Sequence, residues 1–144
     1  GRGAGYTVNI PLEAGAGDKD YRIVFERVVL PIMEAFAPNL LLLSAGYDAH
    51  DRDPLGGMHV STEGYTQMTG MLRALADRSC GGRMAVVTEG GYDIDSLREC
   101  LQATLEVMES PVSSWASSDA GSTERADAAL RQVRRAQAPF WPAL

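Results

Sequence analysis

Residues 39–57 read NLLLLSAGYDAHDRDPLGG, and this stretch decides the fold. Its leucine run, residues 40–43, is bounded by Pro38 and Gly46, which makes it too short for a helix and typical of a strand buried on both faces. An acid-rich turn follows at the carboxyl end of this strand, where open α/β sheets bind their ligands. The turn contains Asp48, His50, Asp51 and Asp53. A metal site in the turn is therefore the first hypothesis.

Strands and helices alternate along the rest of the chain. Two more short segments, residues 6–12 and 84–88, are typical of strands. Apolar residues at three- and four-residue steps predict helices over about residues 18–36, 61–77, 93–108 and 123–137. This alternation predicts an α/β fold in which a parallel sheet is flanked by helices and the functional loops lie on one edge.

Polar residues mark the starts of the predicted helices. A side-chain oxygen at this position accepts an otherwise unpaired backbone N–H and so caps the helix. The candidate caps are Asp18, Ser61 or Thr62, Asp93 or Asp95, and Thr123. Pro31 lies inside the first helix and should kink or divide it.

Composition limits the classes of function. The 144 residues match one domain, and the apolar content of 45% and charged content of 22% are ordinary for a globular protein. A net charge of −6 argues against direct nucleic-acid binding and permits cationic substrates. No apolar run approaches the roughly 20 residues that cross a bilayer, so no membrane partner is expected. Cys80 and Cys100 are expected to be buried and reduced, in a cytoplasmic protein.

The chain divides into three parts by composition. Residues 1–109 carry the alternating pattern, and residues 110–122 are rich in Ser and Ala, as in a flexible connector. Residues 123–144 are predicted to form a terminal helix and a tail that docks through Phe140 and Trp141. The residues do not define the oligomeric state.

Two interpretations compete in the first loop. Asp48-Ala49-His50 is a D-x-H element that, with Asp53, can supply three zinc ligands from one turn. The alternative is that Asp48 caps the turn while His50 and Asp51 are solvated. Asp53 stands out in either case, because Pro54 restricts its backbone to extended conformations and the two glycines that follow let the chain approach a ligand.

A second loop, Glu89-Gly90-Gly91-Tyr92, follows the strand at residues 84–88. The phenol of Tyr92 can donate a hydrogen bond and so stabilise an oxyanion that develops on a carbonyl. The alternative is that the Tyr92 ring only packs against the edge of the sheet.

These motifs together resemble the histone deacetylase superfamily, in particular its class II and bacterial deacetylase-like members. The resemblance rests on SAGYDAHDRDPLGG, VSTEGY and VTEGGYD in this order, and it extends from GAGYTVNIPL to about Met108. It implies an arginase/deacetylase-like α/β fold and zinc-dependent hydrolysis of an N-acetyl amide to acetate and an amine.

The resemblance assigns roles to five residues. Asp53 matches the zinc ligand of the DPLGG motif, and Tyr92 matches the tyrosine that polarises the scissile carbonyl and stabilises the tetrahedral intermediate. Gly90 and Gly91 match the wall of the acyl channel, and Asp48 matches a supporting acid. The implied cofactor is Zn²⁺.

The chain departs from the family in what it lacks. The family's amino-terminal part, with paired histidines as general base and a D-x-H that supplies two zinc ligands, has no counterpart here. His50 and His59, the two histidines of the chain, match neither position. The chain therefore resembles the carboxyl-terminal portion of a deacetylase, with an incomplete sheet, and is expected to be inactive alone.

Three functional alternatives stay open. Acetyl-lysine in proteins is the first expected substrate, and an acetylpolyamine or other small acetyl-amide is the second. Met58 and Val60 are apolar, whereas polyamine-preferring relatives place an acid at the pocket mouth. The fold can also serve as a non-catalytic module that recognises acyl groups, or the chain can be a truncated product without function.

Overall fold

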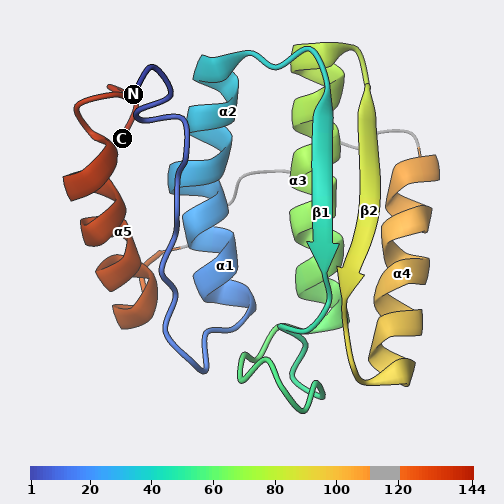
Figure 1. Cartoon of the computed structure of the whole chain (residues 1–144). Helices are drawn as coiled ribbons and strands as arrows, with labels where there is room; N and C mark the ends of the chain where they lie inside the picture. The colour runs from blue at the N-terminus through green and yellow to red at the C-terminus, as the bar shows by residue number, and fades with distance from the viewer. Residues whose placement is uncertain (111–120) are drawn as a thin grey trace.

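The computed structural model describes residues 1–110 and 121–144 (Figure 1). Most of the predicted connector, residues 110–122, lies outside the described residues, and the division into three parts stays a prediction. The elements in chain order are α1 (Asp18–Val24), the π-helical segment η1 (Phe25–Val29), α2 (Leu30–Phe36), β1 (Leu41–Gly46), α3 (Thr62–Cys80), β2 (Met84–Gly90), α4 (Ile94–Glu109) and α5 (Glu124–Gln137).

The sheet is parallel, as predicted. β1 and β2 pair from Leu41 opposite Met84 to Gly46 opposite Gly90, with an irregularity between Ala45 and Gly46. α3 makes the crossover between them, and both arrows in Figure 1 point the same way. The two strands therefore end at the same edge, which brings the loops that follow them together.

Only one face of this sheet is covered within the described residues. Leu41 is buried in a cluster with residues of α3, η1 and α2, and Ala45 is buried in a cluster with residues of α3 and α4. In Figure 1, α3 lies behind β1 and α4 lies beside β2. Leu42 of β1 and Val87 of β2 are on the opposite face from Leu41 and are 69% and 57% exposed. The prediction that the leucine strand is buried on both faces is wrong here, because residues 1–110 and 121–144 place no second layer of helices on the other face.

The first predicted helix is divided, as Pro31 required. Leu30 N donates to Phe25 O, a bond across five residues that marks the π-helical segment immediately before Pro31. An interior proline cannot donate a backbone hydrogen bond and crowds the preceding turn, so the ladder is interrupted there. α2 ends at Phe36, and Ala37 closes it in the left-handed conformation with φ of 51°.

Three helices begin at predicted caps. The side chain of Ser61 accepts from Gly64 N, that of Asp93 from Ser96 N, and that of Thr123 from Ala126 N. The prediction for α1 is wrong: Gly17 is its N-cap, and the Asp20 carboxylate accepts from Gly17 N at 2.9 Å. The Asp18 carboxylate instead accepts hydrogen bonds from Ser61, before α3.

Residues 6–12 do not form the predicted strand. The backbone in and just before this segment bonds instead to side chains near the carboxyl terminus. Gln137 Nε2 donates to Thr7 O at 2.9 Å, and Trp141 Nε1 donates to Gly5 O at 2.8 Å. The apolar residues of the segment instead join a core with α1, η1, α2 and α5. The buried members of this core are Ile23, Val24, Val28, Ile32, Ala126, Ala129, Leu130 and Val133.

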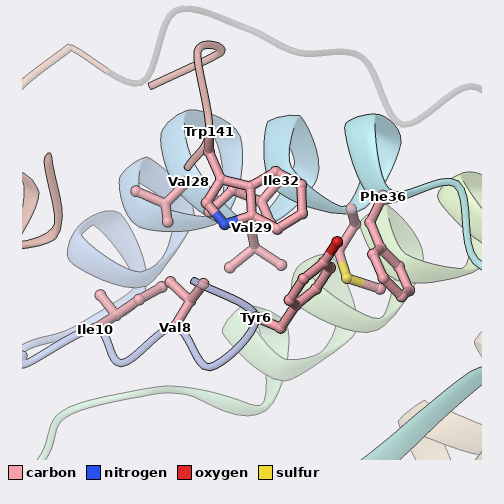
Figure 2. Close-up of a pocket in the computed structure, with 9 residues that line it drawn as sticks. Tyr6, Val8, Ile10, Val28, Val29, Ile32, Phe36 and Trp141 are labelled. Atoms are coloured by element: carbon pink, nitrogen blue, oxygen red, sulfur yellow. The ribbon is translucent and has the colours of Figure 1, made fainter. Parts of the chain in front are cut away.

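An apolar pocket of about 340 Å³ lies where the amino-terminal segment meets η1, α2 and the tail. Figure 2 shows Tyr6, Val8 and Ile10 on one side and Val28, Val29, Ile32 and Phe36 on the other, with Trp141 from the tail. Tyr6 meets Trp141 edge to face with ring centroids 5.9 Å apart. This pocket contains neither Asp53 nor Tyr92.

A leucine-to-alanine substitution should cost much more stability in the covered core than on the bare face of the sheet. Leu130→Ala should reduce the free energy of unfolding by about 2–5 kcal/mol, because Leu130 is 2% exposed and the shortened side chain leaves a cavity. Leu42→Ala should change it by less than about 0.5 kcal/mol in this chain. Urea unfolding followed by circular dichroism measures both, and equal losses would contradict the assignment of the bare face.

Candidate active site

The loops after β1 and β2 meet at the carboxyl edge of the sheet. Tyr47 N, the first amide after β1, donates to Gly90 O, the last carbonyl of β2, at 2.9 Å. The first loop then folds on itself, since Val60 N donates to Ala49 O and Asp51 N donates to Val60 O, both at 3.0 Å. The residues between these bonds, which include Asp53, are therefore held as a closed loop.

The Asp53 side chain connects the two loops. It is 8% exposed, and its Oδ1 accepts from Leu55 N at 2.9 Å and from Gly56 N at 3.1 Å. Its Oδ2 accepts from Tyr92 N at 2.7 Å. The structure thus brings together the two residues that the sequence singled out, one from each loop.

The hydrogen bonds keep Asp53 ionised. Burial alone would raise the pKa of this carboxyl, but the backbone N–H groups of Tyr92, Leu55, Gly56 and Asp93 outweigh burial and hold the pKa below its ordinary value. Asp93 also has a lowered pKa, because Ser96 donates to it from both its backbone and its side chain at the start of α4. The site therefore presents a fixed negative charge at pH 7.

Glycines allow the loops to approach. A Cβ on Gly56 would lie 1.6 Å from Asp48 O, so the DPLGG segment can fold back on Asp48 only with glycine there. Gly91 has φ of +133°, and a Cβ on it would lie 3.2 Å from Tyr47 Cβ. The Asp48 carboxylate is beside Gly90, with Oδ2 3.4 Å from where a Cβ would be. Asp48, Gly90 and Gly91 thus lie at the same edge as Asp53.

The Tyr92 side chain faces solvent at this edge. It is 58% exposed, while its backbone N–H is bonded to Asp53. Whether the ring donates a hydrogen bond to a ligand or packs at the edge of the sheet stays a prediction.

The local zinc site with Asp48, His50 and Asp53 is not formed. His50 is 4% exposed, with Nε2 3.2 Å from Thr62 Oγ1 and Nδ1 2.8 Å from Asp51 Oδ1. No three His, Cys, Asp or Glu side chains gather in a metal-binding arrangement in the part of the chain that the structure describes. The alternative was also wrong for His50, which is buried and not solvated, although Asp51 is exposed.

Sequence reasoning missed two buried tyrosines, whose hydrogen bonds support the first loop and the residue before it. Tyr65 OH accepts from Ala49 N at 3.1 Å, and Tyr47 OH donates to Thr104 Oγ1 at 3.0 Å. Burial raises the pKa of both phenols, so each stays a neutral hydrogen-bonding group. Apolar spacing placed Tyr65 in the core but gave no signal for its bond to the loop.

The candidate site lies where α/β enzymes bind their substrates, at the carboxyl edge of a parallel sheet. The buried, ionised carboxylate of Asp53 is bonded there to the backbone of Tyr92, whose side chain is exposed. Cys80 and Cys100 are free and buried, as expected. None of the described helices is long and apolar enough to cross a membrane.

Comparison with known proteins identifies the family. The model of the histone deacetylase domain matches residues 1–108. Histone deacetylase 15 of Arabidopsis thaliana is 41% identical over 99% of this chain and 25% of its own length, and human polyamine deacetylase HDAC10 is 36% identical over 100% and 21%. The crystal structure of the HDA15 HD domain superposes with a TM-score of 0.85 at 38% identity, over 99% of this chain and 37% of that one.

The chain therefore belongs to the histone deacetylase family, and the predicted arginase/deacetylase-like fold is confirmed. It spans about a quarter of the length of the two named relatives.

The lowered pKa of Asp53 predicts a titration. Because the folded-state pKa lies below the ordinary value of 3.8, the ionised form stabilises the loops above that pH, and this contribution is lost as the pH falls through the folded-state pKa. The amide proton of Tyr92, followed by NMR, should shift with a midpoint below 3.8. Asp53→Asn should abolish the transition, and a midpoint at or above 3.8 would contradict the bonding.

Proposed function

We propose that this chain contributes one zinc ligand and one catalytic phenol to a zinc-dependent deacetylase that hydrolyses N-acetyl amides, with acetyl-lysine in proteins as the first substrate. The single observation that carries the proposal is the 2.7 Å hydrogen bond from Tyr92 N to Asp53 Oδ2, which joins the two loops in a chain of the histone deacetylase family. Hydrolysis would give acetate and a free amine.

Asp53 fits the role of a zinc ligand. Oδ1 accepts from Leu55 N and Gly56 N, and Oδ2 accepts from Tyr92 N, so both oxygens are held in place by the two loops. The lowered pKa keeps the group charged, which favours a bound cation. Catalytic zinc sites use three protein ligands, and residues 1–110 and 121–144 assemble no such set among themselves. The other ligands would come from elsewhere in the whole protein.

The side chains of this chain would act on the amide as follows. When bound, zinc supplies Lewis-acid polarisation of the carbonyl and activates water. Tyr92 donates its phenolic hydrogen bond to the carbonyl oxygen as negative charge develops there, and its exposure leaves it free to do so. Gly90 and Gly91 leave room beside it for the acyl group. Asp48 supports the Asp53 loop through its carbonyl, against which Gly56 packs.

The 144-residue chain alone is proposed to be inactive. The only histidine close to Asp53 in the described chain is His50, which is buried and bonded to Thr62 and Asp51, so it is not placed to take a proton from water. The other histidine, His59, is exposed, and its backbone N–H bonds to Ala16 O. A general base would therefore come from elsewhere in the whole protein.

Substrate choice is a separate part of the proposal. One relative is named a histone deacetylase and another a polyamine deacetylase. Val60 cannot be used as evidence against a polyamine substrate, because its side chain is fully buried and cannot contact a substrate. Of the two apolar residues considered, this leaves Met58, which is half-buried. Acetyl-lysine stays the first choice and small acetyl-amides the second. Direct nucleic-acid binding is not proposed, and a cytoplasmic location stays a prediction.

A non-catalytic module that recognises acyl groups is the second candidate. The solvent-facing phenol of Tyr92 suits recognition as well as catalysis. Turnover separates the two, because a binding module would bind acetyl-lysine peptides stoichiometrically without releasing acetate.

Removal of the phenolic hydroxyl tests the role of Tyr92. In the whole protein, Tyr92→Phe should lower kcat by about 10²–10³, because one oxyanion donor is lost, while zinc content stays unchanged. Tyr6→Phe is the matched control, since Tyr6 is similarly exposed but lies in the distant pocket. Acetate release from an acetyl-lysine peptide is the measurement, and near-normal turnover by Tyr92→Phe would remove the phenol from the mechanism.

Removal of the carboxylate tests the metal role. Asp53→Ala should abolish stoichiometric zinc in the whole protein, measured by metal analysis after dialysis. Asp53→Asn keeps an acceptor for the loop N–H groups but not the charge, and should also lose zinc affinity. Asp95→Ala, an exposed acid on α4, should retain the metal. Full zinc occupancy in both Asp53 variants would refute the assignment of the ligand.

A further inference from the structure

We propose that Asp18 is a positioning residue, which fixes the exit of the loop that carries Asp53. Its effect on zinc rests on the proposed function, whereas its effect on the loop does not.

The carboxylate of Asp18 accepts from both hydrogen-bond donors of one residue in that loop. Oδ1 accepts from Ser61 N at 2.7 Å and Oδ2 accepts from Ser61 Oγ at 2.6 Å. Ser61 Oγ in turn accepts from Gly64 N at 3.1 Å and so caps α3. A Cβ on Gly64 would lie 2.2 Å from Asp18 Oδ1, so this carboxylate fits only beside a glycine. Asp18 thus joins the start of α1 to the start of α3.

The turn before Asp18 holds the same loop by its backbone. Gly15 N donates to Gly57 O, and His59 N donates to Ala16 O, both at 2.8 Å. With the two bonds from Ser61, the second half of the loop is attached to residues 15–18 at three successive places. Asp53 lies four residues before the first of them.

Asp20 anchors this turn to the carboxyl-terminal tail. It is 7% exposed, and its Oδ2 accepts from Gly17 N while its Oδ1 accepts from Thr123 Oγ1. Thr123 is the N-cap of α5. Two carboxylates separated by one residue therefore bind different parts of the chain. Asp18 holds the loop that carries Asp53, and Asp20 holds the carboxyl-terminal tail, which lies beyond the residues matched by the family model.

This arrangement fixes Asp53 from both ends. The loop is attached to the sheet where it begins, through Tyr47, and to the α1 turn where it leaves. Loss of the second attachment lets the segment from Gly57 to Ser61 move, and the carboxylate of Asp53 then spends less time in the position set by Tyr92. The zinc dissociation constant should rise without unfolding of the sheet.

The test compares Asp18→Ala with Asp95→Ala in the zinc-loaded whole protein. Both residues are acids in the first turn of a helix, but in the described part of the chain Asp95 pairs with Arg98 of its own helix, at 3.9 Å, and not with the loop. Zinc competition with a chelator should show a dissociation constant about tenfold higher for Asp18→Ala, the lower end of what outer-shell partners contribute, and no change for Asp95→Ala. Equal constants for the two variants would overturn the effect on zinc.

Hydrogen exchange separates positioning from general stabilisation. In Asp18→Ala the amides of His59 and Ser61 should exchange faster, while those in the ladder between β1 and β2 keep their protection. Unchanged exchange at His59 and Ser61, or an equal increase throughout the sheet, would overturn the proposal.

The tail is tested at Thr123. Thr123→Val removes the hydroxyl that binds Asp20 and should speed exchange at Gly15 and His59, whereas Thr123→Ser keeps the hydroxyl and should restore protection. No difference between these variants would overturn the role of the tail. If the unsubstituted protein binds no zinc, the proposed function fails, but the exchange measurements still decide whether Asp18 holds the loop.

Discussion

The structure depends on one carboxylate that accepts hydrogen bonds from two loops. Asp53 receives the N–H groups of Leu55 and Gly56 from its own loop and that of Tyr92 from the other. A buried carboxylate is tolerated only when such donors compensate its loss of water. The same bonds that make burial of the charge possible also fix the distance between the charge and the loop that presents the phenol.

Everything around this carboxylate restricts how far the loops can move. The parallel register brings both strand ends to one edge, Tyr65 supports the first loop at Ala49, and Asp18 holds its exit at Ser61. Glycine is needed where backbones approach closely, most clearly at Gly56. The site is therefore held by hydrogen bonds on the side that this chain forms, while the face of the sheet with Leu42 and Val87 stays bare in the described residues.

Local patterns in the sequence predicted where helices begin and break better than they predicted which segments pack against one another. Ser61 and Thr123 were recognised as caps because capping needs only neighbours in sequence, and Pro31 divided its helix for the same reason. The strand at residues 6–12 was wrong because its partner proved to be the tail, and no local pattern reports a contact with residues more than 100 positions away. Burial of the leucine strand on both faces was wrong because burial depends on what packs against it.

At the site, too, motifs identified residues, but their long-range partners could not be predicted. DPLGG and EGGY indicated Asp53 and Tyr92, and the structure brings their loops together. Asp18 was read as a cap, because an acid before a helix usually is one, but its oxygens bind a residue 43 positions later. The D-x-H of Asp48 and His50 suggested a local metal site, and only the fold could show that His50 is turned toward Thr62.

We propose that Asp53 holds zinc through an oxygen that also binds the loop of Tyr92. Anomalous diffraction at the zinc edge, from crystals of the whole protein, tests this role most directly. We expect a zinc peak about 2.0–2.2 Å from Asp53 Oδ2, with Tyr92 N still bonded to that oxygen. A zinc ion bound elsewhere, with Asp53 bonded only to backbone amides, would contradict it.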